Sequence, residues 1–391
     1  MKSVEILGPV LKNKGDELTL RSVAERIEPH YALSISTDLK IRGQENLPEL
    51  LQLTSLPGKD EIGEIFHRRS LSKFLSVAKR GIFLSLLPPS VLRKIGYINS
   101  SHQVALLDCS GYAYGDKWSP NRMIKRAEYY KTLREKGIKL ILMPQALGPF
   151  EDPEVRKHAK NLLELFDFVF PREAISENYI LELGIDPAKI EICPDVTHLL
   201  EGPTPSNSEI WSKRVAVVPN ARMQDKTDAT IANQYIDFLV ECIQTVRAND
   251  LEPVIILHEV NDDRLVKTLL SQLDKDIKVF NEDGIISKGF LGSCYANIGF
   301  RYHSLISSLS QATPSLASSW AHKYEELFDA YDCKEYLISP GLSSQEITDK
   351  INEFLAPEKN KQLRDKLQIH ATRQKKEVEN MWQRVESIIS T

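Results

Sequence analysis

The chain has 391 residues, of which 42% are hydrophobic and 27% are charged, and its formal net charge is −4. This length exceeds what one hydrophobic core usually organises, so we expect two domains. No apolar run approaches the roughly 18 residues that cross a bilayer, and the negative charge argues against a chain devoted to nucleic acid.

The first ten residues are interrupted by Glu5, Gly8 and Pro9, which is not typical of a secretory signal. We therefore expect the protein to stay in the cytoplasm. The five cysteines are widely scattered and form no C-x-x-C pair, so they indicate neither disulfides nor a zinc site. They are interpreted as small buried hydrophobic residues.

Short apolar runs alternate with helical patterns along the chain, which is typical of parallel sheets covered by helices. The expected strands are 4–7, 32–36, 104–107, 139–143, 168–170, 191–193, 215–218, 253–257, 277–280, 296–299 and 315–317. The predicted fold class is α/β, with two Rossmann-like lobes whose parallel sheets face a cleft, as in GT-B enzymes. A single split Rossmann-like domain with insertions fits the pattern too.

The stretch 201–208 is rich in Pro and Ser and lacks apolar periodicity, so it marks the expected domain boundary. We predict an N-terminal lobe over 1–203 on the acceptor side, a C-terminal lobe over 209–355 on the donor side, and a closing helix over 356–391. Ligands of open parallel sheets bind beyond the carboxyl ends of the strands, so the chemistry is expected in the loops there, facing the cleft.

One basic segment, 65–97, holds seven Lys or Arg and no Asp or Glu, interleaved with apolar residues. It could be a helical excursion whose apolar face packs on the first lobe while its cations are solvated. It could also contact the inner face of the membrane and bring the protein to a lipid-linked sugar.

Several familiar motifs are absent from the sequence. Neither G-x-G-x-x-G nor a P-loop occurs, so no nucleotide cofactor is indicated. No H-E-x-x-H occurs either, and the pair His258 and Glu259 at a predicted strand end is interpreted as an ordinary loop. We expect no cofactor and no metal.

Basic residues and glycine-containing loops recur just after predicted strands. Arg301 and His303 follow strand 296–299 and lead into a helical pattern, where backbone N–H groups favour an anion. Lys323 and Arg172 occupy similar loops. Further polar loops at strand ends contain Gly15, Asp16, Ser110, Gly111, Tyr112, Tyr114, Gln145 and Gly148.

These residues, in this order, resemble the polysaccharide pyruvyl transferase family from Lys14 to about Cys333. The matching pieces are Gly15-Asp16-Glu17, Pro144-Gln145 through Gly148-Pro149, Arg172-Glu173 through Ser176, Leu183-Gly184, Pro194-Asp195, Arg301 with His303-Ser304, and Pro314 through Lys323. The resemblance implies transfer of pyruvate from phosphoenolpyruvate to two sugar hydroxyls as a ketal, with release of phosphate.

The resemblance implies that cations bind the carboxylate and phosphate of the donor, and it points to Arg172, Arg301, Lys323 and Ser304. His303 suits the proton donor, although it could be a core histidine. Asp195 could accept a proton from the attacking hydroxyl or merely cap a turn.

The acceptor would be a polysaccharide, an oligosaccharide or a lipid-linked glycan, contacted by Gly15, Asp16, Tyr112, Tyr114 and Gln145. The two tyrosines could stack on a sugar ring or only pack their loop. Two other functions stay open: a GT-B glycosyltransferase that uses a nucleotide sugar, and a glycan-binding module without activity. The sequence indicates neither the acceptor sugar nor an oligomeric state.

Overall fold

The computed structural model describes residues 2–9, 14–35, 54–55, 97–98, 102–206, 208–273, 277–318 and 322–391. The chain forms two compact units. Unit 1 comprises Met1–Leu11, Thr19–Val196 and Asn380–Thr391, and unit 2 comprises Lys12–Leu18 and Thr197–Glu379. Residues 12–18 and 197–203, which the sequence placed in the first domain, thus cluster with unit 2.

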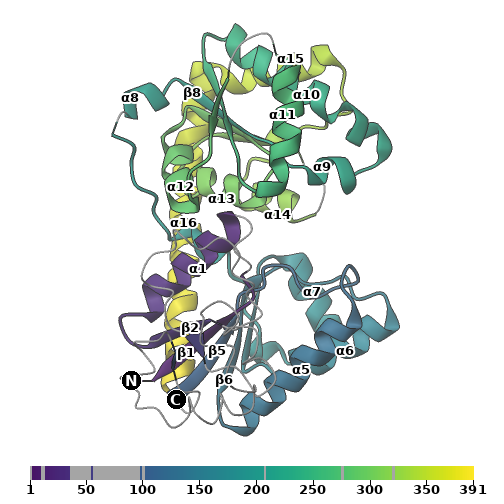
Figure 1. Cartoon of the computed structure of the whole chain (residues 1–391), viewed down its shortest axis with the longest axis vertical. Helices are drawn as coiled ribbons and strands as arrows, with labels where there is room; N and C mark the ends of the chain where they lie inside the picture. The colour runs from purple at the N-terminus through teal and green to yellow at the C-terminus, as the bar shows by residue number, and fades with distance from the viewer. Residues whose placement is uncertain are drawn as a thin grey trace, which may run out of the picture. The chain divides into compact units, whose positions relative to one another are not determined.

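Unit 1 contains a parallel sheet in the order β4-β3-β2-β1-β5-β6-β7, of which Figure 1 labels β1, β2, β5 and β6. Its strands are β1 Ser3–Leu7, β2 Ala32–Ile35, β3 Thr54–Ser55, β4 Tyr97–Ile98, β5 Gln103–Asp108, β6 Lys139–Gln145 and β7 Phe168–Pro171. The strand order reverses between β1 and β5, so the carboxyl ends of these two strands form the topological switch point, where ligands of such sheets bind.

The helices of unit 1 cover the sheet with apolar faces. They are α5 Pro120–Glu135, α6 Pro153–Leu163 and α7 Ala174–Glu182. A further helix, α1 Lys14–Ile27, contributes residues to both units. Asp152 caps α6 by accepting from the backbone N–H groups of Glu154 and Val155 at 2.8 and 3.1 Å, and Pro153 suits the first helical position.

One strand expected in unit 1 is not formed. Residues 191–193 run beside β7 and make only an isolated bridge at Ile190, with Cys193 N–H donating to Pro171 O at 3.0 Å. β7 itself ends at Pro171, whose carbonyl accepts from Cys193, so no further strand residue is available to extend this pairing into a ladder.

Unit 2 contains a second parallel sheet, ordered β10-β9-β8-β11-β12, with its switch point between β8 and β11. Its strands are β8 Arg214–Val218, β9 Glu252–Ile256, β10 Lys278–Phe280, β11 Ala296–Gly299 and β12 Ser315–Ala317. All five strands expected in this half are confirmed, with ends shifted by at most one residue. The predicted α/β class with two parallel sheets is therefore confirmed.

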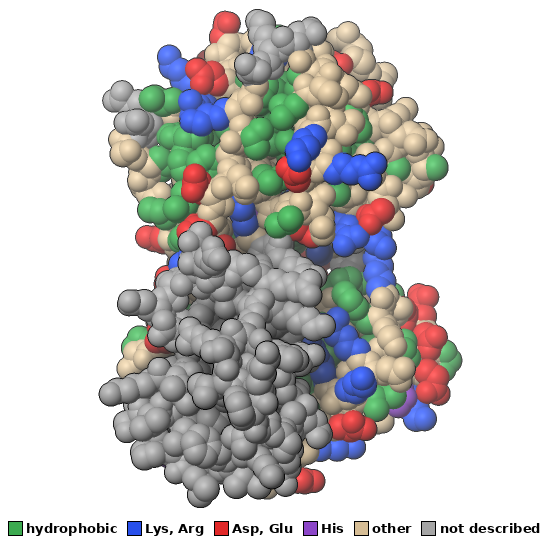
Figure 2. Space-filling model, in the orientation of Figure 1, with side chains coloured by type: hydrophobic (Ala, Val, Ile, Leu, Met, Phe, Trp, Pro, Cys, Tyr) green, Lys and Arg blue, Asp and Glu red, His purple; other side chains and the backbone are tan. Residues whose placement is uncertain are grey.

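The helices and short turns of unit 2 alternate with its strands. They are α8 Ser208–Trp211, α9 Arg222–Asp225, α10 Ala229–Ala248, η6 Val260–Asp262, α11 Asp263–Ser271, α12 Gly284–Ser293, α13 Tyr302–Leu309, α14 His322–Ala330, η7 Lys334–Tyr336 and α15 Ser344–Leu355. In Figure 2, acidic and basic side chains are interspersed with hydrophobic ones over the visible face of unit 2.

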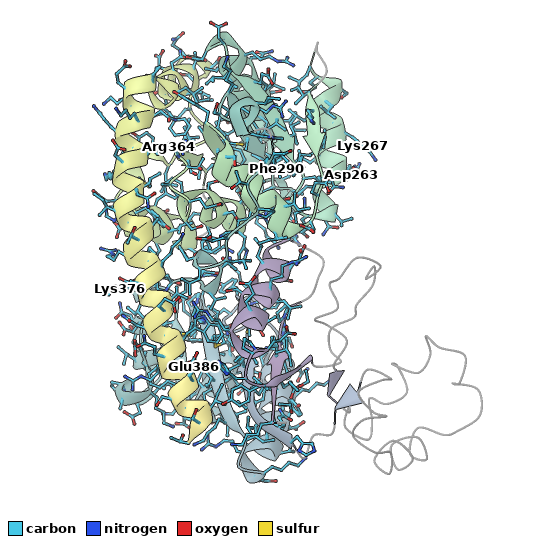
Figure 3. All side chains as sticks on the ribbon, turned by 90° about the vertical axis from the view of Figure 1, so that its left-hand side faces the viewer. Asp263, Lys267, Phe290, Arg364, Lys376 and Glu386 are labelled. Atoms are coloured by element: carbon cyan, nitrogen blue, oxygen red, sulfur yellow. The ribbon has the colours of Figure 1, made fainter. Side chains whose placement is uncertain are left out.

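The helix α16, Pro357–Ser390, occupies the segment for which the sequence predicted a long helix. Arg364, Lys376 and Glu386 mark its course in Figure 3. Arg364 donates through Nη2 to the carbonyl oxygens of Cys294 and Tyr295 at 3.2 and 2.9 Å. One face of α16 is buried, at Leu363, Leu367, Ala371, Val378, Met381, Trp382, Val385 and Ile389.

All five cysteines are buried free thiols, as the sequence predicted. Among the helices that the structure describes, none is both long enough and apolar enough to span a bilayer. The basic segment 65–97 lies outside the described residues, apart from Tyr97 at the start of β4.

Candidate active site

The loops after β8, β9 and β11 gather the polar residues of unit 2. Because parallel strands end at the same edge of a sheet, residues that follow neighbouring strands come close together. Asn220 follows β8, His258 and Glu259 follow β9, and Arg301 follows β11 and stands directly before α13. The sequence indicated only the last of these loops as a site.

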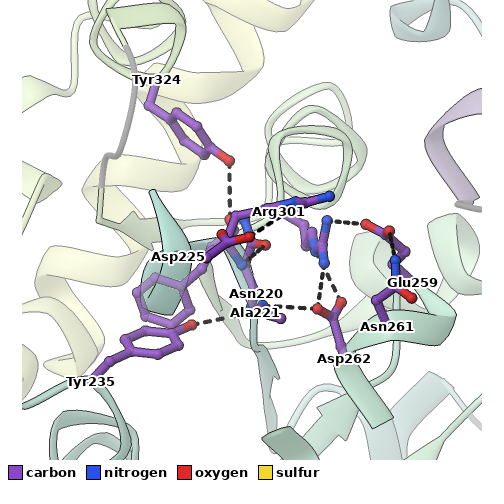
Figure 4. A network of polar contacts seen from close by, with 11 residues as sticks. Asn220, Ala221, Asp225, Tyr235, Glu259, Asn261, Asp262, Arg301 and Tyr324 are labelled. Carbon is purple, nitrogen blue, oxygen red and sulfur yellow. Dashed lines mark hydrogen bonds and ion pairs between the residues drawn. The ribbon is translucent and has the colours of Figure 1, made fainter. Parts of the chain in front are cut away.

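Arg301 is held by two carboxylates (Figure 4). Its Nε donates to Asp262 Oδ2 at 2.9 Å, its Nη2 pairs with Asp262 Oδ1, and its Nη1 pairs with Glu259 Oε2. Burial raises the pKa of Asp262 above its ordinary value, although the hydrogen bonds from Arg301 act in the opposite direction. The guanidinium is therefore engaged inside the protein, in a partly desolvated ion-pair network.

The same network ties three loops together. Asp262 Oδ1 accepts from the N–H of Ala221 at 2.9 Å, which joins the β9 loop to the β8 loop. The carbonyl of Phe300 accepts from Asn220 Nδ2 at 2.6 Å and from the Tyr324 hydroxyl at 3.0 Å. The backbone immediately before Arg301 is thereby fixed.

His303 lies in the first turn of α13, against Gly15 of α1. A Cβ added to Gly15 would lie 2.2 Å from His303 Nδ1 and 2.6 Å from its Cγ. No side chain fits there, so glycine is needed for this close approach. The sequence singled out both residues but not their contact.

The start of α1 is fastened to the end of β9. The backbone N–H of Lys14 donates to His258 O at 3.2 Å, and its ammonium donates to the carbonyl of Leu257. Glu17 Oε2 accepts from the N–H of Gly284, at the start of α12, at 2.8 Å. These bonds hold Gly15 and the partly exposed Asp16 near His303.

Positive charge is disfavoured on Lys14 and His258, because both side chains are buried and His258 also lies near other basic residues. Burial lowers the pKa of Lys14 to about 8, with Glu17 and Asp283 opposing the shift. Burial also lowers the pKa of His258 well below its ordinary value, and Lys14, His303 and Arg301 add to that effect. His258 is thus a buried member of the cluster and not an ordinary loop residue; its position directly after a strand was the available signal.

Lys323 lies near the same turn. Its Nζ is 5.2 Å from the centroid of the Tyr302 ring and 5.7 Å from that of Tyr324, within reach of cation–π attraction. The Tyr302 ring in turn meets that of His303 edge-to-face, with centroids 5.6 Å apart. The structure therefore brings Arg301, His303 and Lys323 together.

Ser304 was expected to bind the donor, but its side chain is fully buried. Its hydroxyl donates to the carbonyl of Arg301 at 2.7 Å, so it supports the first turn of α13 from within. The structure thus gives this hydroxyl a role inside the turn, and its expected contact with the donor stays a prediction.

In unit 1, Arg172 and Asp195 form a buried ion pair, with Nη1 and Oδ2 2.8 Å apart. Glu173 lies 3.9 Å from Arg172 Nε and accepts from the hydroxyl of Ser176. The backbone N–H of Arg172 donates to Gln145 O at 3.1 Å. The structure thus brings together three of the expected site residues, Arg172, Asp195 and Gln145.

A second buried network surrounds Asp108, the last residue of β5. The hydroxyls of Tyr114 and Tyr130 both donate to Asp108 Oδ2, the latter at 2.6 Å. Arg126 Nη1 lies 3.4 Å from the same oxygen and donates to Ser110 Oγ at 2.6 Å. The sequence did not single out Asp108 or Arg126.

The expected sugar-stacking role of Tyr114 is corrected by this network, because the ring is fully buried and burial raises the pKa of its hydroxyl. Tyr112 remains partly exposed. Its hydroxyl donates to Gly148 O at 3.1 Å, and its ring meets Trp118 edge-on at 6.4 Å. Among the described residues, no group of three or more His, Cys, Asp or Glu is placed to hold a metal ion.

Comparisons with known proteins agree with the two-sheet fold. Alr3699/HepE of Anabaena, crystallised with UDP and glucose, is 14% identical, with a TM-score of 0.58 and 100% of both chains covered. UDP-GlcNAc 2-epimerase of Neisseria meningitidis, bound to UDP-GlcNAc, is 12% identical, with a TM-score of 0.51 over 93% of this chain and 94% of that chain. At such identities the likeness shows the fold alone, and it confirms the predicted class of two Rossmann-like lobes as in GT-B enzymes.

A sequence model described as polysaccharide pyruvyl transferase matches residues 13–322 of the chain. The match includes Gly15, Arg172, Asp195, Arg301 and His303, the residues on which the resemblance was first based, and it ends next to Lys323. The chain therefore belongs to the polysaccharide pyruvyl transferase family.

Proposed function

We propose that the protein transfers pyruvate from phosphoenolpyruvate to two hydroxyls of a glycan, forming a ketal and releasing inorganic phosphate. The observation that carries this proposal is the grouping of His303 with Lys323 at the carboxyl edge of one parallel sheet, in a chain of this family. An imidazole that can donate a proton, near an ammonium that can bind an anion, suits protonation of an anionic donor.

In the proposed reaction, His303 protonates C3 of phosphoenolpyruvate, which makes C2 electrophilic. One sugar hydroxyl then adds to C2, and its proton passes to a carboxylate, for which Asp195 is our candidate. Phosphate leaves with the electron pair of its C–O bond, and the second hydroxyl closes the ketal and releases its proton. Lys323 offsets the charge of the donor, and Arg172 would orient Asp195, with which it forms an ion pair.

We assign the acceptor to the residues around Tyr112 and Gln145 in unit 1. Tyr112 is partly exposed beside Trp118 and so offers an aromatic surface of the kind that sugars favour. Gln145 Oε1 is buried and makes no hydrogen bond within the described residues, and an acceptor of this kind suits a sugar hydroxyl. A lipid-linked glycan belongs to the same proposal.

The test is to incubate the protein with phosphoenolpyruvate and a panel of free, nucleotide-linked and lipid-linked glycans. We expect phosphate release that depends on one acceptor class, together with the mass gain of a pyruvate ketal on that acceptor. Lys323→Met should raise the KM for phosphoenolpyruvate more than it lowers kcat. Lys334→Met removes another lysine of unit 2, one paired with Asp329, and is the matched control.

The alternative is a glycosyltransferase that uses a nucleotide sugar, since Alr3699/HepE shares the fold and was crystallised with UDP-glucose. The two functions differ in donor. Saturable thermal stabilisation by UDP-glucose, with none by phosphoenolpyruvate in the presence of acceptors, would favour the glycosyltransferase and contradict our proposal.

A further inference from the structure

We propose that Asp262 and Glu259 are positioning residues, which hold Arg301 so that the first turn of α13 presents His303 in one orientation. Arg301 is then a positioning residue as well, and not a ligand of the donor. The inference rests on the proposed function, because it assigns roles around the same imidazole.

The charge balance at Arg301 supports this assignment. A guanidinium has five N–H donors, and Arg301 gives three of its nitrogens to Asp262 and Glu259. One positive charge faces two negative ones, and the Arg301 side chain is only 12% exposed. A phosphate or carboxylate brought to this guanidinium would meet two carboxylates of its own sign.

The backbone links Arg301 to the imidazole. Arg301 is the residue before α13, and its carbonyl accepts from Ser304 N–H at 3.0 Å, from Leu305 N–H at 3.2 Å and from Ser304 Oγ at 2.7 Å. His303 lies inside the turn that these bonds close. Any displacement of Arg301 therefore moves His303 with it.

The carboxylates are themselves fixed from other loops. Asp262 accepts from Ala221 N–H at 2.9 Å, and Glu259 Oε1 accepts from Asn261 Nδ2 at 2.8 Å (Figure 4). The Asp262 side chain is 1% exposed, and the Glu259 side chain is 13% exposed. The network thus transmits the position of the β8 and β9 loops to the turn that carries His303.

A positioning role and a ligand role predict different kinetics. If the carboxylates position His303, removing one of them lowers kcat and leaves the KM for phosphoenolpyruvate nearly unchanged. If Arg301 bound the donor, removing the charge of Glu259 would free the guanidinium and lower that KM. A purely structural role would lower thermal stability without altering the environment of His303 in the folded protein.

The experiment compares Glu259→Gln with Asp263→Asn in the full chain. Asp263 is the matched control, because this neighbouring carboxylate is 52% exposed and pairs only on the surface with Lys267, 2.6 Å away (Figure 3). We expect Glu259→Gln to lower kcat by about tenfold or more, because the His303 imidazole is no longer held in position. Asp263→Asn should leave kcat unchanged. Asp262→Asn, whose site is more deeply buried, should act in the same direction.

A second measurement does not depend on activity. The imidazole signals of His303, assigned by their loss in His303→Asn, should shift in Glu259→Gln and stay in place in Asp263→Asn. If the wild type releases no phosphate from phosphoenolpyruvate, the proposed function fails while this measurement still tests the positioning. Unshifted His303 signals in a folded Glu259→Gln, or a lowered KM with normal kcat, would overturn the inference.

Discussion

Replacing Gly15 with alanine would test the role of His303 without changing the imidazole itself. The new Cβ would lie 2.2 Å from Nδ1, 2.6 Å from Cγ and 2.8 Å from Cε1 of His303, whereas ordinary contacts begin at 3.4 Å. The ring must therefore retreat by 3.4 − 2.2, or about 1.2 Å. A misplacement of about 1 Å can cost roughly 10²-fold in rate, so we expect kcat to fall by about that factor.

The folded state should survive this change. The obstacle is a side chain that can rotate, and alanine is favoured over glycine in a helix by up to about 1 kcal/mol. Phosphate release should thus fall while the thermal midpoint stays close to that of the wild type. Gly341→Ala is the control, since a Cβ there would lie 3.5 Å from Ser339 Oγ. A folded Gly15→Ala protein with normal kcat would refute the reasoning.

Further outcomes follow from the same contacts. His303→Asn should lower kcat by roughly 10² to 10⁴ with little change in the thermal midpoint, and near-normal turnover would remove this residue from the mechanism. Arg172→Met leaves the Asp195 carboxylate buried without its ion-pair partner and should cost about 3 to 5 kcal/mol in denaturant unfolding, most of which a second change, Asp195→Leu, should restore. Because burial lowers the pKa of Lys14 from 10.5 to about 8, the folded chain binds fewer protons than the unfolded chain between these pH values. The free energy of unfolding of the wild type, minus that of Lys14→Met, should therefore rise with pH across that window by on the order of 3 kcal/mol. A difference that does not change with pH would contradict the lowered pKa of Lys14. If the basic segment 65–97 contacts membranes, co-sedimentation with anionic vesicles should fall as salt rises, and equal recovery with neutral vesicles would exclude that contact.

The sequence predicted the sheets well, because apolar runs bounded by Gly, Pro or Asp identify buried parallel strands. It failed at residues 191–193, which pair with β7 through two backbone hydrogen bonds but form no strand, because β7 ends at Pro171. It also identified the loops that hold Arg301, His303 and Lys323, since chemistry in such folds lies at the carboxyl ends of strands.

The sequence did not indicate the partners of these residues. Asp262 and Glu259 meet Arg301 across separations of 39 and 42 residues, and no local pattern encodes such a pairing. Tyr114 shows the same limit: its loop contains glycines and polar residues, which indicated exposure. Only the three-dimensional network around Asp108 explains why the ring is buried.

The division of the chain into units has a consequence for biosynthesis. Unit 1 needs Asn380–Thr391, including the buried side chains of Met381 and Trp382, whereas most of its residues precede Thr197. Unit 1 can therefore be completed only after the end of α16 has been translated, although most of its sequence is translated first. A truncation that removes 380–391 would damage the unit encoded near the N-terminus and leave the composition of unit 2 intact.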